Sequence, residues 1–154
     1  MRLGDHLRED RILVGVEAAD RPTLLSHLGR ALVASGVPAD PLEMERLLAV
    51  REAQSSTVLG HGIAVPHASL PLLEDPVLLV AVTADWVPFG APEEDPVRIF
   101  FTLLTPPAQE GVHVRLLARI CRVARHRHVL EGLMTASSAG QALDVLRSAD
   151  GEEP

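Results

Sequence analysis

The sequence predicts a single α/β domain in which a mixed central β-sheet is flanked by helices on both faces. Two continuous apolar runs, residues 77–82 and 97–104, have the composition of strands that are covered on both sides. Helical patterns come before and after these runs, which favours helices packed on a sheet. The 154 residues, 47% of them apolar, suffice for one domain with a substantial core.

The N-terminal part is predicted to contain one strand and two helices. Residues 11–16 form a short apolar run typical of a strand. A helix follows over residues 20–36, because Asp20 and Pro22 give a start signal and leucines recur at helical spacing. A second helix is predicted over residues 40–54, and its first turn carries a pattern resembling a capping box.

The C-terminal part is predicted to be mostly helical. Residues 86–95 carry two prolines, a glycine and three acids between the two apolar runs, and we expect them to form a loop. Three helical patterns then follow, over residues 112–125, 129–134 and 138–147. The domain is expected to span residues 1–149, with residues 150–154 as a frayed acidic tail.

Composition excludes several classes of function. A formal net charge of −7 argues against a nucleic-acid partner. All 14 basic residues are arginine, so a Schiff-base lysine and a phosphate loop with its lysine are absent. No apolar run is long enough to cross a bilayer and the N-terminus is no signal peptide, while the single cysteine fits a reducing cytoplasm. The sequence therefore predicts a cytoplasmic protein.

The strongest functional signal is His67, which ends the stretch Gly60-His-Gly-Ile-Ala-Val-Pro-His. If residues 61–67 are extended, Ile63, Val65 and His67 share one face, and Pro66 places the strand end at a rim. His61 would then lie about 20 Å from His67, too far for one metal ion. With no zinc-ligand spacing we expect no metal site, which leaves a structural, a base or a nucleophilic histidine.

Two further side chains are candidates for a site with His67. Arg51 continues the inward stripe of the second helix, where it either extends to solvent near the helix C-terminus or directs its guanidinium at a phosphate. His113 lies in the first turn of the third helix, where it either packs and caps or contacts an anion held at the helix N-terminus. Position alone leaves both alternatives open.

These segments together resemble a known family. Arg51-Glu52, Ser55-Ser56-Thr57 and residues 60–68 closely resemble the signature of the fructose/mannitol-type EIIA domains (EIIA type 2), which belong to the bacterial phosphoenolpyruvate-dependent sugar phosphotransferase system and include a nitrogen-regulatory branch. Residues 86–104, and Gln109-Glu110 ahead of His113, extend the resemblance over most of the chain. The family fold, a mixed sheet flanked by helices, agrees with the fold predicted from the residues.

The resemblance implies a phosphotransferase whose phosphohistidine intermediate forms on His67. His67 would accept a phosphoryl group from the phosphocarrier protein HPr, His113 would assist, and Arg51 would stabilise the phosphoryl oxygens. The supporting motif would comprise Thr57, Gly60, Gly62 and Pro66. Transfer between two histidines requires no metal and no organic cofactor, so none is expected.

Two functions remain open, together with a third in which a relative has lost phosphorylation. In the first, the protein passes the phosphoryl group to an EIIB partner in sugar transport, and approaches the membrane only through the EIIB and EIIC partners. In the second, it controls a regulatory target through its own phosphorylation state. The sequence specifies neither the sugar nor the oligomeric state.

Overall fold

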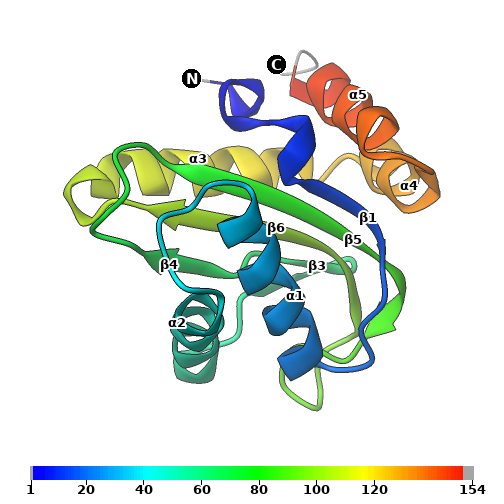
Figure 1. Ribbon diagram of the computed structural model, residues 1–154. Coiled ribbons are helices and arrows are strands. Elements are labelled where there is room, and N and C mark those ends of the chain that lie inside the picture. The colour runs from blue at the N-terminus through cyan, green and yellow to red at the C-terminus, as the bar shows by residue number, and fades with distance from the viewer. Residues whose placement is uncertain (1, 151–154) are drawn as a thin grey trace.

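A six-stranded mixed β-sheet lies between two layers of helices in the computed structural model, which describes residues 2–150 (Figure 1). The sheet order is β1-β5-β6-β3-β2, and β4 pairs with β6 further along the same edge as β3. β5 and β6 are antiparallel, whereas β1 is parallel to β5, and β3 and β4 are parallel to β6. The strands are β1 (Ile12–Val16), β2 (Val58–Gly60), β3 (Ile63–Ala64), β4 (His67–Ser69), β5 (Val77–Val87) and β6 (Val97–Thr105).

The two helical layers bury opposite faces of the sheet, which confirms the predicted fold class. Ile99, Phe101 and Leu103 of β6 belong to one apolar cluster, and Phe100 and Leu104 belong to the other. Because successive side chains of a strand point to opposite faces, both faces of β6 are covered. The helices are α1 (Arg21–Ala34) and α2 (Pro41–Gln54) on one face, and α3 (Glu110–Val123), α4 (Arg127–Thr135) and α5 (Ala139–Asp150) on the other (Figure 1).

Local capping explains why the first two helices begin where the sequence predicts. The Asp20 carboxylate accepts a hydrogen bond from the Thr23 N–H, and the Asp40 carboxylate accepts from the N–H groups of Leu42 and Glu43. The Glu43 side chain pairs with Arg46 instead of completing the capping box that the sequence resembles. Three short 3₁₀ segments were not predicted: η1 (Leu3–His6), η2 (Glu9–Arg11) and η3 (Pro107–Gln109).

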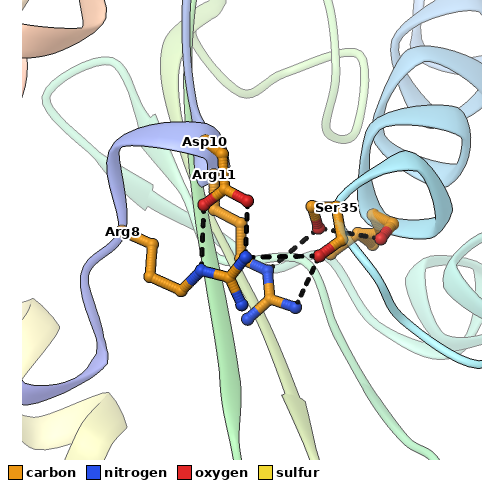
Figure 2. A network of polar contacts seen from close by, with 5 residues as sticks. Arg8, Asp10, Arg11 and Ser35 are labelled. Carbon is orange, nitrogen blue, oxygen red and sulfur yellow. Dashed lines mark hydrogen bonds and ion pairs between the residues drawn. The ribbon is translucent and has the colours of Figure 1, made fainter.

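The end of α1 is bonded to the segment that leads into β1. The Arg11 guanidinium donates to the hydroxyl and the carbonyl of Ser35, at 2.9 and 3.1 Å, and Arg8 pairs with Asp10 beside it (Figure 2). Ser35 is the C-cap of α1, so these bonds satisfy acceptors at the helix end. The network therefore fixes the first helical layer against the edge strand of the sheet.

Two predicted elements are wrong in their boundaries. Residues 61–67 are not one strand, because His61 and the flanking Gly60 and Gly62 have positive φ and form a turn between β2 and β3. Trp86 lies in β5, since that strand continues to Val87 after a shift in its pairing with β6. The predicted loop is therefore shorter than expected at its start.

The last predicted helix extends to Asp150, the final described residue. Residues 151–154, which form the rest of the predicted tail, lie outside the described residues. Within residues 2–150, no helix has the length and apolarity that crossing a membrane requires.

Candidate functional site

Three predicted site residues meet in one open pocket at the carboxyl end of β6. Arg51 comes from the last turn of α2, His67 is the first residue of β4, and His113 comes from the first turn of α3. The pocket has a volume of about 490 Å³ and also includes Thr105 at the end of β6. The sheet edge and both helical layers thus contribute to one site.

The ring orientation of His67 is set by a hydrogen bond to its own strand segment. Its Nδ1 lies 2.9 Å from the carbonyl oxygen of Val65. Because a carbonyl only accepts, Nδ1 carries a proton, and in the neutral ring the lone pair is then on Nε2. Ile63 and Val65 pack in the same apolar cluster as Leu103, the strand partner of His67, so the predicted sharing of one face is confirmed. The arrangement leaves His67 able to act as a nucleophile through Nε2.

His113 lies beside His67 and is fixed by Thr105. The two ring centroids are 5.1 Å apart in an edge-to-face arrangement, and His113 Nδ1 lies 2.9 Å from Thr105 Oγ1. Burial lowers the pKa of His113; the adjacent His67 and Arg51 lower it further, against an opposing effect of the Glu110 carboxylate. A lowered pKa keeps the His113 ring neutral at neutral pH.

The lowered pKa of His113 predicts that folding stability falls in mild acid. Below its ordinary pKa of about 6.5 the unfolded chain takes up a proton that the folded chain resists, so the free energy of unfolding decreases as pH falls from 6.5 toward the folded-state value. Urea unfolding at several pH values between 8 and 5 measures this decrease. We expect His113→Gln to reduce it and the exposed-site variant His61→Gln to retain it; equal pH dependence in both variants would contradict the assignment.

Arg51 lies at the edge of the buried stripe of α2 rather than within it. It is half-buried, and its Nη1 donates a 2.8 Å hydrogen bond to the carbonyl of Ser55, the C-cap of the same helix. This bond corresponds to the first of the two roles predicted for Arg51, an interaction near the helix C-terminus. A guanidinium has five N–H donors, so the remaining donors are available to an anion in the pocket.

The buried continuation of the α2 stripe is Glu52, which was not predicted as a site residue. Its side chain is 5% exposed, and its two oxygens accept hydrogen bonds from the N–H and the hydroxyl of Thr57, at 2.7 and 2.8 Å. The sequence did indicate that Glu52 faces inward, because it follows the buried Met44 and Leu48 at intervals of four residues.

None of the four predicted supporting residues lines the His67 pocket. Thr57 is buried against Glu52, and Pro66 is buried between β3 and β4. Gly60 and Gly62 have φ of 94° and 80°, and a Cβ on Gly62 would lie 2.9 Å from the Trp86 ring. This position favours glycine, since its backbone is left-handed and a Cβ would require the Trp86 ring to shift.

A larger cavity of about 840 Å³ lies at the opposite end of β6, next to His61 and Trp86. The nine residues of β6 separate it from the His67 pocket by roughly 25 Å. His61 is therefore not part of the candidate site. Among residues 2–150, no group of three His, Cys, Asp or Glu side chains is arranged to hold a metal ion.

Comparison with known proteins finds a matching family and proteins with the same fold. A family model described as "Phosphoenolpyruvate-dependent sugar phosphotransferase system, EIIA 2" matches residues 5–149. The PTS system fructose-specific EIIA component of Haloferax volcanii is 32% identical over 96 residues, 62% of this chain and 62% of that protein. The chain thus spans less than two thirds of the length of this relative.

Nitrogen regulatory proteins match over greater lengths. That of Pseudomonas aeruginosa is 32% identical over 140 residues, 90% of each chain. The crystal structure of the nitrogen regulatory protein IIA-Ntr from Neisseria meningitidis superposes with a TM-score of 0.84 at 28% identity, covering 94% of this chain and 98% of that one. The mixed sheet and its two helical layers are therefore shared with these proteins over nearly the whole length of the chain.

Proposed function

We propose, since the chain belongs to the EIIA 2 family of the phosphoenolpyruvate-dependent sugar phosphotransferase system, that it is a phosphoryl carrier and bears the phosphoryl group on Nε2 of His67. The observation that supports this role most directly is the bond from His67 Nδ1 to the Val65 carbonyl, in a pocket shared with Arg51 and His113. It leaves the lone pair of Nε2 as the nucleophile.

In the proposed reaction a phosphohistidine of the donor protein transfers its phosphoryl group in line to His67. The bond between Nε2 and phosphorus forms as the N–P bond of the donor breaks, and the electron pair of that bond returns to the donor ring. His67 keeps its Nδ1 proton, so no general base is required. The Val65 carbonyl stabilises the positive charge that the ring gains on phosphorylation.

His113 and Arg51 provide hydrogen-bond donors to the phosphoryl oxygens. The buried Thr105 hydroxyl lies at hydrogen-bond distance from His113 Nδ1, so we assign Thr105 as the donor of that bond and place the His113 proton on Nε2. The neutral ring then donates N–H to a phosphoryl oxygen, while Arg51 supplies a positive charge.

The shape of the site fits protein partners. Val50 lines the pocket and is 48% exposed, and Val114 next to His113 is 61% exposed. Exposed apolar residues around an open pocket are typical of a surface that another protein covers. We propose HPr as the donor and an EIIB protein as the acceptor, so that the chain acts in sugar uptake.

The alternative, in which the phosphorylation state controls a regulatory target, is supported by similarity to nitrogen regulatory proteins over most of their length. The Pseudomonas aeruginosa nitrogen regulatory protein matches over 90% of this chain and 90% of its own length. The two functions differ in the fate of the phosphoryl group, which either passes to an EIIB protein or stays on the chain.

One experiment separates them. The protein is labelled with radioactive phosphoenolpyruvate, enzyme I and HPr, and is then mixed with candidate EIIB proteins. Rapid passage of the label to an EIIB protein supports transport. Retention of the label, together with binding of a target that prefers one phosphorylation state, supports regulation. Absence of labelling contradicts both functions.

Arg51→Ala is expected to slow phosphorylation about tenfold, because one charged donor to the phosphoryl oxygens is lost at a partly solvated site. The rate of labelling by phosphorylated HPr measures the effect. Arg46→Ala is the matched control, since Arg46 lies on the same helix but pairs with Glu43 at the surface. Wild-type labelling of Arg51→Ala would limit Arg51 to its bond with the Ser55 carbonyl.

A further inference from the structure

The carboxylate of Glu52 is buried next to the site but contacts neither the pocket nor the phosphoryl group in the proposed mechanism. A buried carboxylate is costly unless hydrogen bonds replace its lost hydration. Both of its oxygens accept such bonds, and both donors belong to Thr57. The carboxylate therefore fixes this one residue of the loop between α2 and β2 at two points.

Thr57 passes this restraint to the segment before His67. Its carbonyl oxygen accepts a 3.0 Å hydrogen bond from the N–H of Val65. The carbonyl of the same residue, Val65, accepts the 2.9 Å bond from His67 Nδ1. A continuous series of hydrogen bonds thus runs from the carboxylate on α2, through two backbone groups, to the ring of the histidine.

We infer that Glu52 is a positioning residue for His67. It holds Thr57 and, through it, the backbone of Val65 in the conformation that keeps the ring proton of His67 on Nδ1. Residues 60–62 are left-handed and turn the chain back, so the bond between Thr57 and Val65 closes this turn at its base. Without the carboxylate the Val65 carbonyl loses its fixed direction, and the preference of His67 for one tautomer weakens. This positioning role serves a function only in the proposed phosphoryl transfer, but the series of hydrogen bonds does not depend on that proposal.

The test compares Glu52→Ala and Glu52→Gln by two readouts. The first is the tautomer of His67 in the unphosphorylated protein, measured from the ring ¹⁵N chemical shifts by NMR at pH 8. The second is the rate of labelling by phosphorylated HPr. Glu43→Ala is the matched control, because Glu43 is an exposed carboxylate on the same helix that pairs with Arg46 at the surface.

We expect the wild type and Glu43→Ala to show His67 protonated at Nδ1. In Glu52→Ala the ring should become a mixture of both tautomers, with labelling slowed about ten- to hundredfold. Glu52→Gln should retain most of the wild-type tautomer, because its amide oxygen still accepts from the Thr57 N–H and its amide N–H can donate to the hydroxyl. If Glu52→Ala does not fold, Thr57→Ala, which removes only the hydroxyl bond, gives the same readout with a smaller shift.

The outcomes separate this inference from the proposed function. An unchanged His67 tautomer in a folded Glu52→Ala protein overturns the positioning role, whatever the labelling rate. If the tautomer changes in Glu52→Ala but HPr does not label the wild-type protein, the proposed function is overturned and the positioning role stays in place. A changed tautomer with slowed labelling supports both.

Discussion

Replacement of His67 by alanine is expected to reduce the acid-labile label from phosphoenolpyruvate, enzyme I and HPr to background. The methyl group of alanine has no lone pair, and in the proposed mechanism His113 donates a proton to the phosphoryl oxygens instead of attacking phosphorus. Quantifying the phosphorylated fraction after complete reaction of the wild type measures the effect.

The control for this variant is His61→Ala, which changes a histidine of the same sequence motif at the other end of β6. It should be labelled to the same extent as the wild type. Because His67 is half-buried at a rim, the folding stability of His67→Ala should change by no more than about 1 kcal/mol. Full labelling of a folded His67→Ala protein would refute the assignment of His67, and labelling of His113 would be the first alternative to test.

The parts of the fold that local sequence determines were predictable. The N-terminal bounds of α1 and α2 follow from Asp20 and Asp40, whose side chains cap their own helices. β6 was predicted to within a residue, because both of its faces are covered and every position except Arg98 is buried. The resemblance to a family was needed to predict that His67 and His113 lie side by side, because no local sequence pattern indicates it.

The features that sequence did not reveal depend on contacts between distant segments or on loop conformation. The turn at His61 forms where Gly62 lies against Trp86, a residue 24 positions later that was itself assigned to a loop. The bonds from Arg51 to the Ser55 carbonyl and from Thr57 to Glu52 are local, but they depend on the conformation of the residues after α2, which the helical pattern does not specify. A helical pattern shows which residues face inward but not which loop they meet.

α2 carries both Arg51 and Glu52, and its position depends on a close approach to α1 at Gly29. A Cβ on Gly29 would lie 2.8 Å from the Pro41 carbonyl oxygen and 3.1 Å from the Glu45 backbone N. Both atoms belong to the backbone of α2, so no side-chain rotation relieves the contact. The two helices would have to move apart.

Gly29→Ala is therefore expected to destabilise the protein, although alanine is the better helix former. Alanine gains about 1 kcal/mol in helix propensity, whereas overpacking against backbone atoms that cannot rotate away costs about 2–3 kcal/mol, the upper part of the usual range, so we expect a net loss of about 1–2 kcal/mol. For a chain of this size such a loss lowers the melting temperature by roughly 2–8 °C. Chemical and thermal unfolding, each followed by circular dichroism, measure it.

Gly111→Ala provides the opposite expectation within the same protein. Gly111 lies in α3, and the nearest atom to its added Cβ is the flexible Arg115 Nη1 at 3.6 Å. This variant should be neutral or more stable by up to about 1 kcal/mol.

Because displacement of α2 also moves Arg51 and Glu52, labelling of Gly29→Ala by HPr should slow about tenfold while Gly29→Ala remains folded. A stabilised Gly29→Ala protein with wild-type labelling would mean that the helices accommodate the methyl group and that the α1–α2 contact does not set the geometry of the site.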